Sequence, residues 1–315
     1  MKTILITGGA GFIGSNLISR LLNSGDQVIC IDNLITGSMK NIEAFLNNPN
    51  FLFIEHNICS PIPIPNSLCI DQIYHLASIA SPEKYKKYPI ETLETSINGT
   101  QHVLDLCKKH NARLLFTSTS EIYGDPLIHP QPEEYFGNVN PIGERSCYDE
   151  GKRVCETLLY EYRKAYNLDL KIVRLFNTYG PNMDINDGRV ITNFIQKIIN
   201  NEPIEIYGHG NQTRSFCYID DMIDALILMM NSKHHGPFNL GNPHCEVTLN
   251  RLAQIFETIT QEPLCKLYLN STQDDPKLRK PVIDKAILYL GWRPKIGLEE
   301  GLKKTMAYFM KEYIW

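Results

Sequence analysis

Short, almost purely apolar runs recur through the first half of the chain, separated by stretches in which apolar residues return every three or four positions. The runs do not alternate with polar residues, which is typical of strands buried on both faces of a parallel sheet. The spacing between them is typical of amphipathic helices. Strands that alternate with helices predict an α/β fold with a doubly wound parallel sheet. The predicted strands are Thr3–Thr7, Gln27–Ile31, Phe51–Ile54, Gln72–His75, Arg113–Thr117 and Leu170–Arg174, and the principal helices are Ile90–His110 and Tyr148–Tyr166.

The pattern changes after about Asn177, where short loops, separated helices and isolated strands such as Ile204–Ile206 and Phe238–Leu240 dominate. This pattern predicts a second, smaller lobe that covers a substrate. The stretch Phe216–Met230 is expected to return to the first domain, so the division is not contiguous. We expect the first domain to comprise residues 1–178 plus about 216–236, and the lobe to comprise residues 179–215 and 237–315.

A glycine-rich turn lies between the first predicted strand and the helix that follows it. Gly8, Gly11 and Gly14 let the backbone turn tightly and approach a pyrophosphate at the positive end of that helix. Asp32 ends the second predicted strand, where an acid hydrogen-bonds ribose hydroxyls and repels a 2′-phosphate. Glycines alone also occur in ordinary strand–turn–helix units. The acid at the next strand end indicates a Rossmann domain that binds NAD.

The bulk properties exclude several other classes of protein. With 315 residues, 43% hydrophobic and 21% charged, the chain has an ordinary globular composition and room for a large core. A net charge of −4 indicates neither nucleic-acid nor membrane binding. No apolar run approaches the ~20 residues that span a bilayer, and the early first strand leaves no room for a signal peptide. Nine scattered cysteines without CxxC pairs fit reduced thiols, so we expect a cytoplasmic protein.

Tyr148 and Lys152 lie four residues apart at the start of a predicted helix and therefore share one face. A phenol with a pKa of about 10 is a poor base, but a neighbouring ammonium and a cationic nicotinamide stabilise the phenolate. The pair can then remove the proton from a substrate hydroxyl as hydride leaves. A solvated tyrosine and a surface lysine give the same spacing by chance. The position of the pair downstream of a dinucleotide turn favours catalysis.

A polar segment follows the predicted strand Arg113–Thr117, at the edge where such sheets collect ligands. Thr119 or Ser120 is placed to donate to a sugar oxygen, and Glu121 to move a second proton or orient the substrate. The alternative is a Ser/Thr turn with an exposed glutamate. His75, at another strand end, is interpreted as structural, and the histidines show no metal spacing, so no metal is implied.

Several longer motifs give the chain a family resemblance. It is similar to the extended short-chain dehydrogenases/reductases of the NAD-dependent epimerase/dehydratase family, which act on nucleotide sugars. The resemblance runs from Lys2 to about Phe309. The stretches that carry it are His75–Ser78, Ser118–Pro126, Asn140–Gly143, Cys147–Arg153, Arg174–Pro181, Asn186–Arg189, Gln212–Tyr218, Asp274–Pro276 and Arg279–Pro281.

The resemblance implies a closed redox cycle on a nucleotide sugar, and one residue selects the subgroup. The dehydratases carry Thr-Asp-Glu where this chain has Thr119, Ser120 and Glu121, and their aspartic acid protonates a departing hydroxyl. Ser120 is a poor acid and would support the loss of a hydroxyl badly. Decarboxylation needs no such acid, because carbon dioxide leaves without a proton. The resemblance therefore points to members that decarboxylate UDP-glucuronate to UDP-xylose through a 4-keto intermediate. Alternatives are a 4-epimerase or 4,6-dehydratase of the same family, or a non-catalytic binding protein on the same fold.

The resemblance also implies roles for individual residues. In catalysis it implies Tyr148, Lys152, Thr119, Ser120, Glu121 and Arg279, and it leaves the donor of the new C5 proton open between Glu121 and Arg279. The residues implied for NAD are Gly8, Gly11, Phe12, Ile13, Gly14, Asp32, Asn33, Thr36, Gly37, Asn57, Ile58, Leu76, Ser78, Thr117, Tyr148, Lys152 and Arg189. The residues implied for the UDP-sugar are Tyr85, Asn177, Tyr207, Gln212, Arg214 and Arg279.

Two positions depart from the family's pattern. Asn57 stands where an aspartate contacts the adenine amino group, although an amide oxygen still accepts a hydrogen bond. Ser96 stands where an asparagine is usual near the catalytic helix, which bears on how Lys152 is held. The resemblance further implies a homodimer with the helices Ile90–His110 and Tyr148–Tyr166 at its interface.

Overall fold

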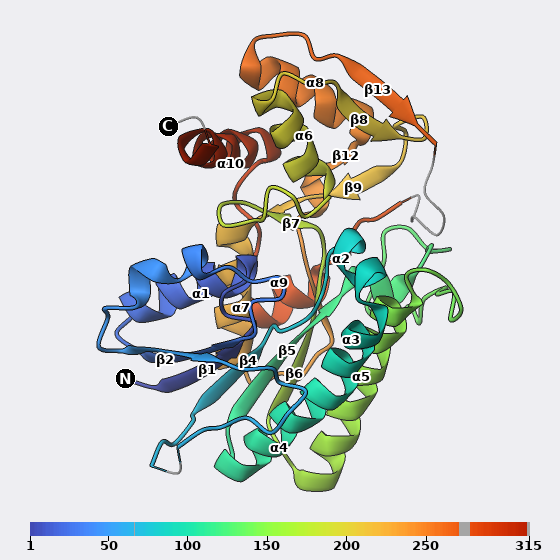
Figure 1. The fold of residues 1–315 in the computed structure, drawn as a ribbon. Helices are drawn as coiled ribbons and strands as arrows, with labels where there is room; N and C mark the ends of the chain where they lie inside the picture. Colours follow the sequence, from blue (N-terminus) through green and yellow to red (C-terminus); the bar gives the residue numbers. More distant parts are fainter. Residues whose placement is uncertain (66, 271–277, 314–315) are drawn as a thin grey trace.

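One parallel sheet organises the larger part of the molecule. The computed structural model describes residues 1–65, 67–270 and 278–313, and within them seven strands form this sheet in the order β11-β6-β5-β4-β1-β2-β3 (Figure 1). The strands are β1 (Thr3–Thr7), β2 (Gln27–Asp32), β3 (Phe51–Glu55), β4 (Gln72–His75), β5 (Arg113–Thr119), β6 (Leu170–Leu175) and β11 (Phe238–Leu240). The α/β fold and all six predicted strands are confirmed. The Asp274–Pro276 motif lies outside the described residues.

Helices cover both faces of the sheet. α1 (Phe12–Asn23) and α7 (Ile219–Asn231) pack together on one face, and α4 (Thr100–His110) and α5 (Ser146–Tyr166) pack together on the other (Figure 1). Ile4 and Ile6 of β1 belong to the core that includes α1 and α7, whereas Leu5 belongs to the core that includes α4 and α5. Both faces of the strand are buried, which explains its apolar sequence without alternation.

Two predicted elements need correction. The helix expected over Ile90–His110 is divided into α3 (Pro89–Glu94), a π-helical turn (Thr95–Gly99) and α4. The strand Phe238–Leu240 falls within the range expected for the smaller lobe, but as β11 it pairs with β6 at the edge of the main sheet. So short a strand carries too little pattern to reveal its partner, because pairing depends on contacts distant in the sequence.

The smaller lobe lies beyond the carboxyl ends of the strands (Figure 1). Its paired strands are β8 (Ile204–Tyr207) with β13 (Lys266–Leu269), β9 (Thr213–Ser215) with β12 (Glu246–Thr248), and β7 (Thr178–Tyr179) with β10 (Cys217–Tyr218). The remaining helices are α2 (Pro82–Lys87), α6 (Val190–Ile199), α8 (Leu249–Thr260), α9 (Asp284–Leu290) and α10 (Leu298–Tyr313), with 3₁₀ turns at Met39–Asn41, Glu43–Phe45, Ser120–Tyr123 and Pro243–Cys245.

The chain returns from the lobe to the first domain through α7. Arg20 of α1 and Asp224 of α7 form an ion pair at 2.6 Å, as the expected return of Phe216–Met230 requires. None of the helices in the described ranges combines the length and apolar character that a bilayer crossing requires.

Candidate active site

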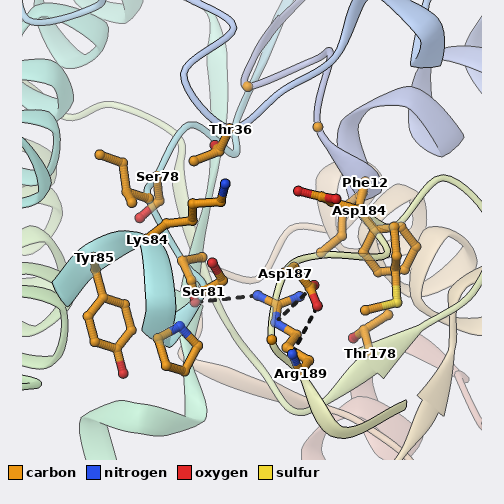
Figure 2. A pocket seen from close by; sticks show the side chains of 18 of the residues that line it. Phe12, Thr36, Ser78, Ser81, Lys84, Tyr85, Thr178, Asp184, Asp187 and Arg189 are labelled. Atoms are coloured by element: carbon orange, nitrogen blue, oxygen red, sulfur yellow. Dashed lines mark hydrogen bonds and ion pairs between the residues drawn. The ribbon is translucent and has the colours of Figure 1, made fainter. Parts of the chain in front are cut away.

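A cavity of about 830 Å³ opens at the carboxyl ends of the parallel strands, between the sheet and the smaller lobe. The strand order reverses here between β1 and β4, which is where open α/β sheets bind ligands. Every residue expected to take part in catalysis or binding lines this cavity except Arg279, which contacts the lining residues Ser120 and Glu121. Figure 2 shows part of the lining, with Tyr85 and Lys84 of α2 opposite Arg189 and Asp187.

The turn after β1 lets the backbone approach a ligand closely. Gly8 has a φ of +73°, and a side chain at Gly14 would lie 2.3 Å from the Gly8 carbonyl oxygen. α1 begins at Phe12, and Phe12, Ile13 and Gly14 line the cavity. The positive end of the helix, with its unpaired backbone N–H groups, therefore borders the space where a diphosphate can bind.

Asp32 joins this turn from the end of β2. Its carboxylate accepts hydrogen bonds from the backbone N–H groups of Ala10, at 3.0 Å, and Leu34, at 2.8 Å. Burial raises the pKa of Asp32, and these hydrogen bonds oppose the rise. A side chain at Gly37 would lie 2.8 Å from Asp32 Oδ1, so the glycine leaves the carboxylate room to accept further hydrogen bonds.

Polar groups near the turn fit a dinucleotide. The hydroxyl of Ser78 is buried, and it has no hydrogen-bond partner in the described part of the chain. A buried hydroxyl without a partner indicates that a ligand or water completes it. Figure 2 places Ser78 around the same space as Thr36 and Phe12. Asn57 Oδ1 accepts from the backbone N–H of Cys59 at 3.0 Å, which leaves one of its two lone pairs for adenine.

Tyr148 lies in the first turn of α5, where it is 6% exposed and its ring stacks on Tyr85 of α2. Burial raises the pKa of Tyr148 to about 12, although a hydrogen bond with Thr119 and the charge of Arg189 oppose the rise. Thr119 Oγ1 in turn accepts from the backbone N–H of Glu121 at 3.2 Å. The phenolate therefore needs further positive charge in the loaded site.

Lys152 lies one turn further along α5. Its Nζ donates to the Thr117 carbonyl oxygen at 2.9 Å and lies 6.0 Å from the centre of the Tyr148 ring. Burial lowers the pKa of Lys152 to about 8. The ammonium thus acts on the phenol through space. Ser96 in the π-helical turn abuts Gly151, and within the described residues its buried hydroxyl has no partner, so it does not bond Lys152.

Glu121 lies between two guanidinium groups. Arg145 Nη2 donates to Glu121 Oε2 at 2.5 Å, while Arg279 Nη1 donates to Oε1 at 3.2 Å and to Ser120 Oγ at 2.9 Å. Burial raises the pKa of Glu121, but Arg279 and Arg145 outweigh it and hold the pKa at about 2. Glu121 is therefore ionised at neutral pH, and Ser120 accepts a hydrogen bond from a cation.

The smaller lobe supplies the opposite wall through Tyr207, Gln212 and Arg214, and Asn177, at the end of the first domain, adjoins them. Gln212 Nε2 donates to the Tyr207 carbonyl oxygen at 2.7 Å, and Arg214 Nη1 donates to that of Thr213 at 2.8 Å. These bonds hold an amide and a guanidinium at the rim of the cavity. Both groups suit a nucleoside diphosphate.

Arg189 reaches from the lobe towards the first domain (Figure 2). Its Nη2 donates to the Ala80 carbonyl oxygen at 3.4 Å, and its Nε lies 3.7 Å from Asp187 Oδ2. The side chain therefore connects the two sides of the cavity near Tyr148, whose pKa its charge lowers.

Three polar residues of the site were missed by the sequence reasoning. Arg145 and Lys84 line the cavity, and Asp149 is buried beside the cluster around Glu121. The position of Asp149 directly after Tyr148, four residues after Arg145, is the signal that could have drawn attention to this pair. Lys84 carried no such signal.

Fold and site together define an enzyme with a Rossmann domain that uses a dinucleotide to act on a second, polar ligand. The chain belongs to the NAD dependent epimerase/dehydratase family, whose model matches residues 4–241. The cofactor of this family is NAD.

Two relatives of the chain are named UDP-glucuronic acid decarboxylases. The chain is 49% identical to UDP-glucuronic acid decarboxylase 1 of Xenopus tropicalis, over 99% of this chain and 73% of that protein. It is 50% identical to UDP-glucuronic acid decarboxylase 4 of Arabidopsis thaliana, over 97% of this chain and 68% of that protein.

Solved structures of two epimerases are also similar. The UDP-glucose 4-epimerase of Thermotoga maritima matches with a TM-score of 0.90 and 31% identity, over 98% of this chain and 99% of that one. A Bacillus cereus UDP-glucuronic acid 4-epimerase, in complex with UDP-glucuronic acid and NAD, matches with a TM-score of 0.86 and 30% identity, over 99% of this chain and 100% of that one.

Proposed function

We infer that this chain is an NAD-dependent enzyme that decarboxylates UDP-glucuronate to UDP-xylose through a 4-keto intermediate. The observation that carries this is identity of 49–50% over nearly the whole chain to proteins named UDP-glucuronic acid decarboxylase, against 30–31% to the epimerases above. Ser120, which is a poor substitute for the acid that a dehydratase needs, supports the same choice.

The residues around the glycine turn are proposed to hold the cofactor. Asp32 accepts hydrogen bonds from the adenosine ribose, and the start of α1 binds the diphosphate. The buried hydroxyl of Ser78 forms a hydrogen bond with the cofactor. When bound, NAD supplies the acceptor that takes hydride from C4 of the sugar and later returns it.

Tyr148 is the proposed base for the oxidation. Its phenolate takes the proton from the C4 hydroxyl, and the buried ammonium of Lys152 stabilises the anion through space. The hydrogen bond between Thr119 and Tyr148 keeps the phenol directed at the reacting oxygen. The same phenol returns the proton to C4 at the end of the cycle.

Oxidation at C4 places the C6 carboxylate β to a ketone. Carbon dioxide then leaves with its C–C bond broken, and the electron pair delocalises onto the C4 oxygen, which Tyr148 and Thr119 stabilise by hydrogen bonding. C5 takes a proton from the Glu121–Arg279 pair. Asn177, Tyr207, Gln212 and Arg214 are proposed to hold the UDP part, and Tyr85 and Arg189 to border the sugar.

A 4-epimerase is the second candidate, because a structural neighbour of 30% identity is crystallised with UDP-glucuronic acid and NAD. The two activities separate in one assay: purified protein is mixed with UDP-glucuronate, and carbon dioxide and the sugar product are followed by NMR. Carbon dioxide with UDP-xylose supports decarboxylation. An inverted C4 with the carboxylate retained supports epimerisation, and unchanged substrate rejects both.

We also propose that the protein is a homodimer in a reducing cytoplasm. Ile90 of α3, Ile97 of the π-helical turn and Tyr160 of α5 are exposed apolar side chains on the helices expected at the interface. All nine cysteines are unpaired, which suits a reducing compartment. Sedimentation of the purified protein as a monomer would contradict the dimer.

A further inference from the structure

The proposed decarboxylation consumes one proton per turnover. Loss of carbon dioxide breaks the C5–C6 bond and leaves the electron pair on the C5–C4–O unit, so C5 must gain a proton. The proton that Tyr148 removes from the C4 hydroxyl returns to the same oxygen and cannot serve C5. The missing proton therefore comes from solvent, at a stage when cofactor and nucleotide sugar fill the main cavity.

A second cavity, of about 210 Å³, lies beside the main one. Its lining includes Gly124, Asp125 and Val139, which follow β5 in the chain, and Arg145 and Asp149 of the α5 region. Arg145 lines the main cavity as well, so this residue lies between the two spaces.

The wall between the cavities consists of charged hydrogen-bonding groups. Arg145 donates to Glu121, which faces the main cavity. Arg279 donates to Glu121 and also, through Nη2, to the carbonyl oxygen of Gly124 at 3.2 Å, on the side of the second cavity. The Gly124 backbone packs closely against Asn138, because a side chain there would lie 1.9 Å from the Asn138 carbonyl oxygen. Ionised and hydrogen-bonded groups therefore link the second cavity to the reacting side of the wall.

Two polar atoms at this wall are buried without a hydrogen-bond partner among the described residues, Nε of Arg279 and Oδ1 of Asp149. Asp149 lines the second cavity and is only 7% exposed. Burial, followed by the charge of Glu121, raises the pKa of Asp149 to about 7. Asp149 thus holds a proton near neutral pH, whereas Glu121 does not. The charged groups that face Asp149 are Glu121, Arg145, Arg279 and Glu150.

We propose that the second cavity admits the solvent proton and that Asp149 relays it to the Glu121–Arg279 pair. The inference rests on the proposed function. In the relay, the O–H bond of Asp149 breaks and its proton passes through a bridging water to Glu121, which carries it only transiently because Arg279 and Arg145 favour its carboxylate. The new O–H bond on Glu121 then breaks as the proton adds to C5. Water in the second cavity returns a proton to Asp149. No oxidant or reductant is needed, and one proton is consumed for each carbon dioxide released.

Asp149→Asn tests the relay, because it keeps the shape of the side chain and removes its proton. Single-turnover mixing of NAD-loaded protein with UDP-glucuronate is followed by NADH absorbance and carbon dioxide release. We expect the rise of NADH and the release of carbon dioxide to keep their wild-type rates. The later fall of NADH and the appearance of UDP-xylose are expected to slow by about 10²-fold, the scale of a lost general acid.

Two further variants isolate the route. Val139→Phe, which places a larger apolar side chain at the second cavity and leaves the Asp149 carboxyl group in the protein, is expected to slow the same late steps. Asp125→Asn removes an exposed carboxylate from the same cavity and is expected to change neither phase. In wild-type protein the late phase is expected to slow as the pH rises through about 7, and Asp149→Asn is expected to lose this dependence.

The outcomes separate the two proposals. If the wild-type protein releases carbon dioxide but Asp149→Asn leaves the late phase unchanged, the relay is wrong and the function stands. A slowed NADH rise in Asp149→Asn would show a role in positioning Tyr148 instead, and would also overturn the relay. If the wild-type protein releases no carbon dioxide from UDP-glucuronate, the proposed function fails together with the relay.

Discussion

Tyr85 and Tyr148 stack face to face, with ring centroids 5.3 Å apart and ring planes 4° from parallel. One ring comes from α2 and the other from α5, so the stack joins two segments that border the cavity. The Tyr85 hydroxyl is buried and has no partner within the described residues. The ring of Tyr85 therefore fixes the orientation of the Tyr148 phenol, the proposed base, and the Tyr85 hydroxyl remains available to a ligand.

This stack predicts different effects for two substitutions at Tyr85. Tyr85→Leu removes the aromatic contact and is expected to lower kcat by up to about tenfold, since such a pair is worth ~0.5–1.5 kcal/mol. Tyr85→Phe keeps the contact and is expected to keep kcat, with a higher KM because the hydroxyl is lost. Steady-state kinetics with UDP-glucuronate measure both. Equal kcat in the two variants would mean that the stack has no part in orienting Tyr148.

Tyr148→Phe removes the proposed base while keeping the ring on Tyr85. Loss of a general base predicts a fall in turnover of about 10²–10⁴-fold. The affinity for UDP, measured by calorimetry, is expected to stay near that of the wild type, because the proposed contacts to UDP come from other residues, Asn177, Tyr207, Gln212 and Arg214. A variant with wild-type turnover would remove Tyr148 from its role.

Asp32→Asn tests the cofactor side of the site. The two carboxylate oxygens of Asp32 each accept a hydrogen bond from a backbone N–H group, one from Ala10 and one from Leu34. The asparagine side chain has a single oxygen and cannot replace both carboxylate oxygens. Losing a charged acceptor predicts about tenfold weaker NAD binding or more. The preference for NAD over a 2′-phosphorylated dinucleotide is expected to fall as well. Fluorescence titration with both cofactors measures the two affinities, and a melting curve separates these effects from a loss of folding. An unchanged ratio of affinities would place the ribose contact elsewhere.

The sequence predicted the parts of this molecule that depend on local pattern. The six strands, α1 and α5 follow from apolar runs and helical spacing, and the turn at Gly8 and Gly14 follows from glycines between a strand and a helix. Tyr148 and Lys152 share a helix, so spacing alone placed them together.

Features that depend on contacts between distant segments escaped the sequence reasoning. The packing of Arg279 on Glu121 joins positions 158 residues apart, and it was expected only because of the family resemblance. Arg145 and Asp149 gain their significance from burial against that pair, which no periodicity encodes. The π-helical turn that splits Ile90–His110 and the pairing of β11 with β6 likewise reflect tertiary packing.

His75 predicts a pH dependence of stability. The ring is 1% exposed between Thr7 Oγ1, at 2.7 Å, and Thr100 Oγ1, at 3.0 Å. Burial, with the nearby charge of Lys152, lowers its pKa to about 3, against about 6.5 in the unfolded chain. Between these values the unfolded state binds a proton that the folded state does not, so stability falls as the pH falls from about 6.5 towards 3.

The variant His75→Asn isolates this contribution, because it removes the titrating ring and keeps every other titratable side chain of the protein. For the wild type, linkage predicts that His75 alone accounts for about 2 kcal/mol of lost unfolding free energy between pH 7 and pH 5. His75→Asn is expected to be less stable at pH 7, where both threonine contacts are disturbed, and to lose less stability on acidification. Urea unfolding of both proteins at the two pH values measures the difference, and equal losses would show that His75 does not titrate in the unfolding transition.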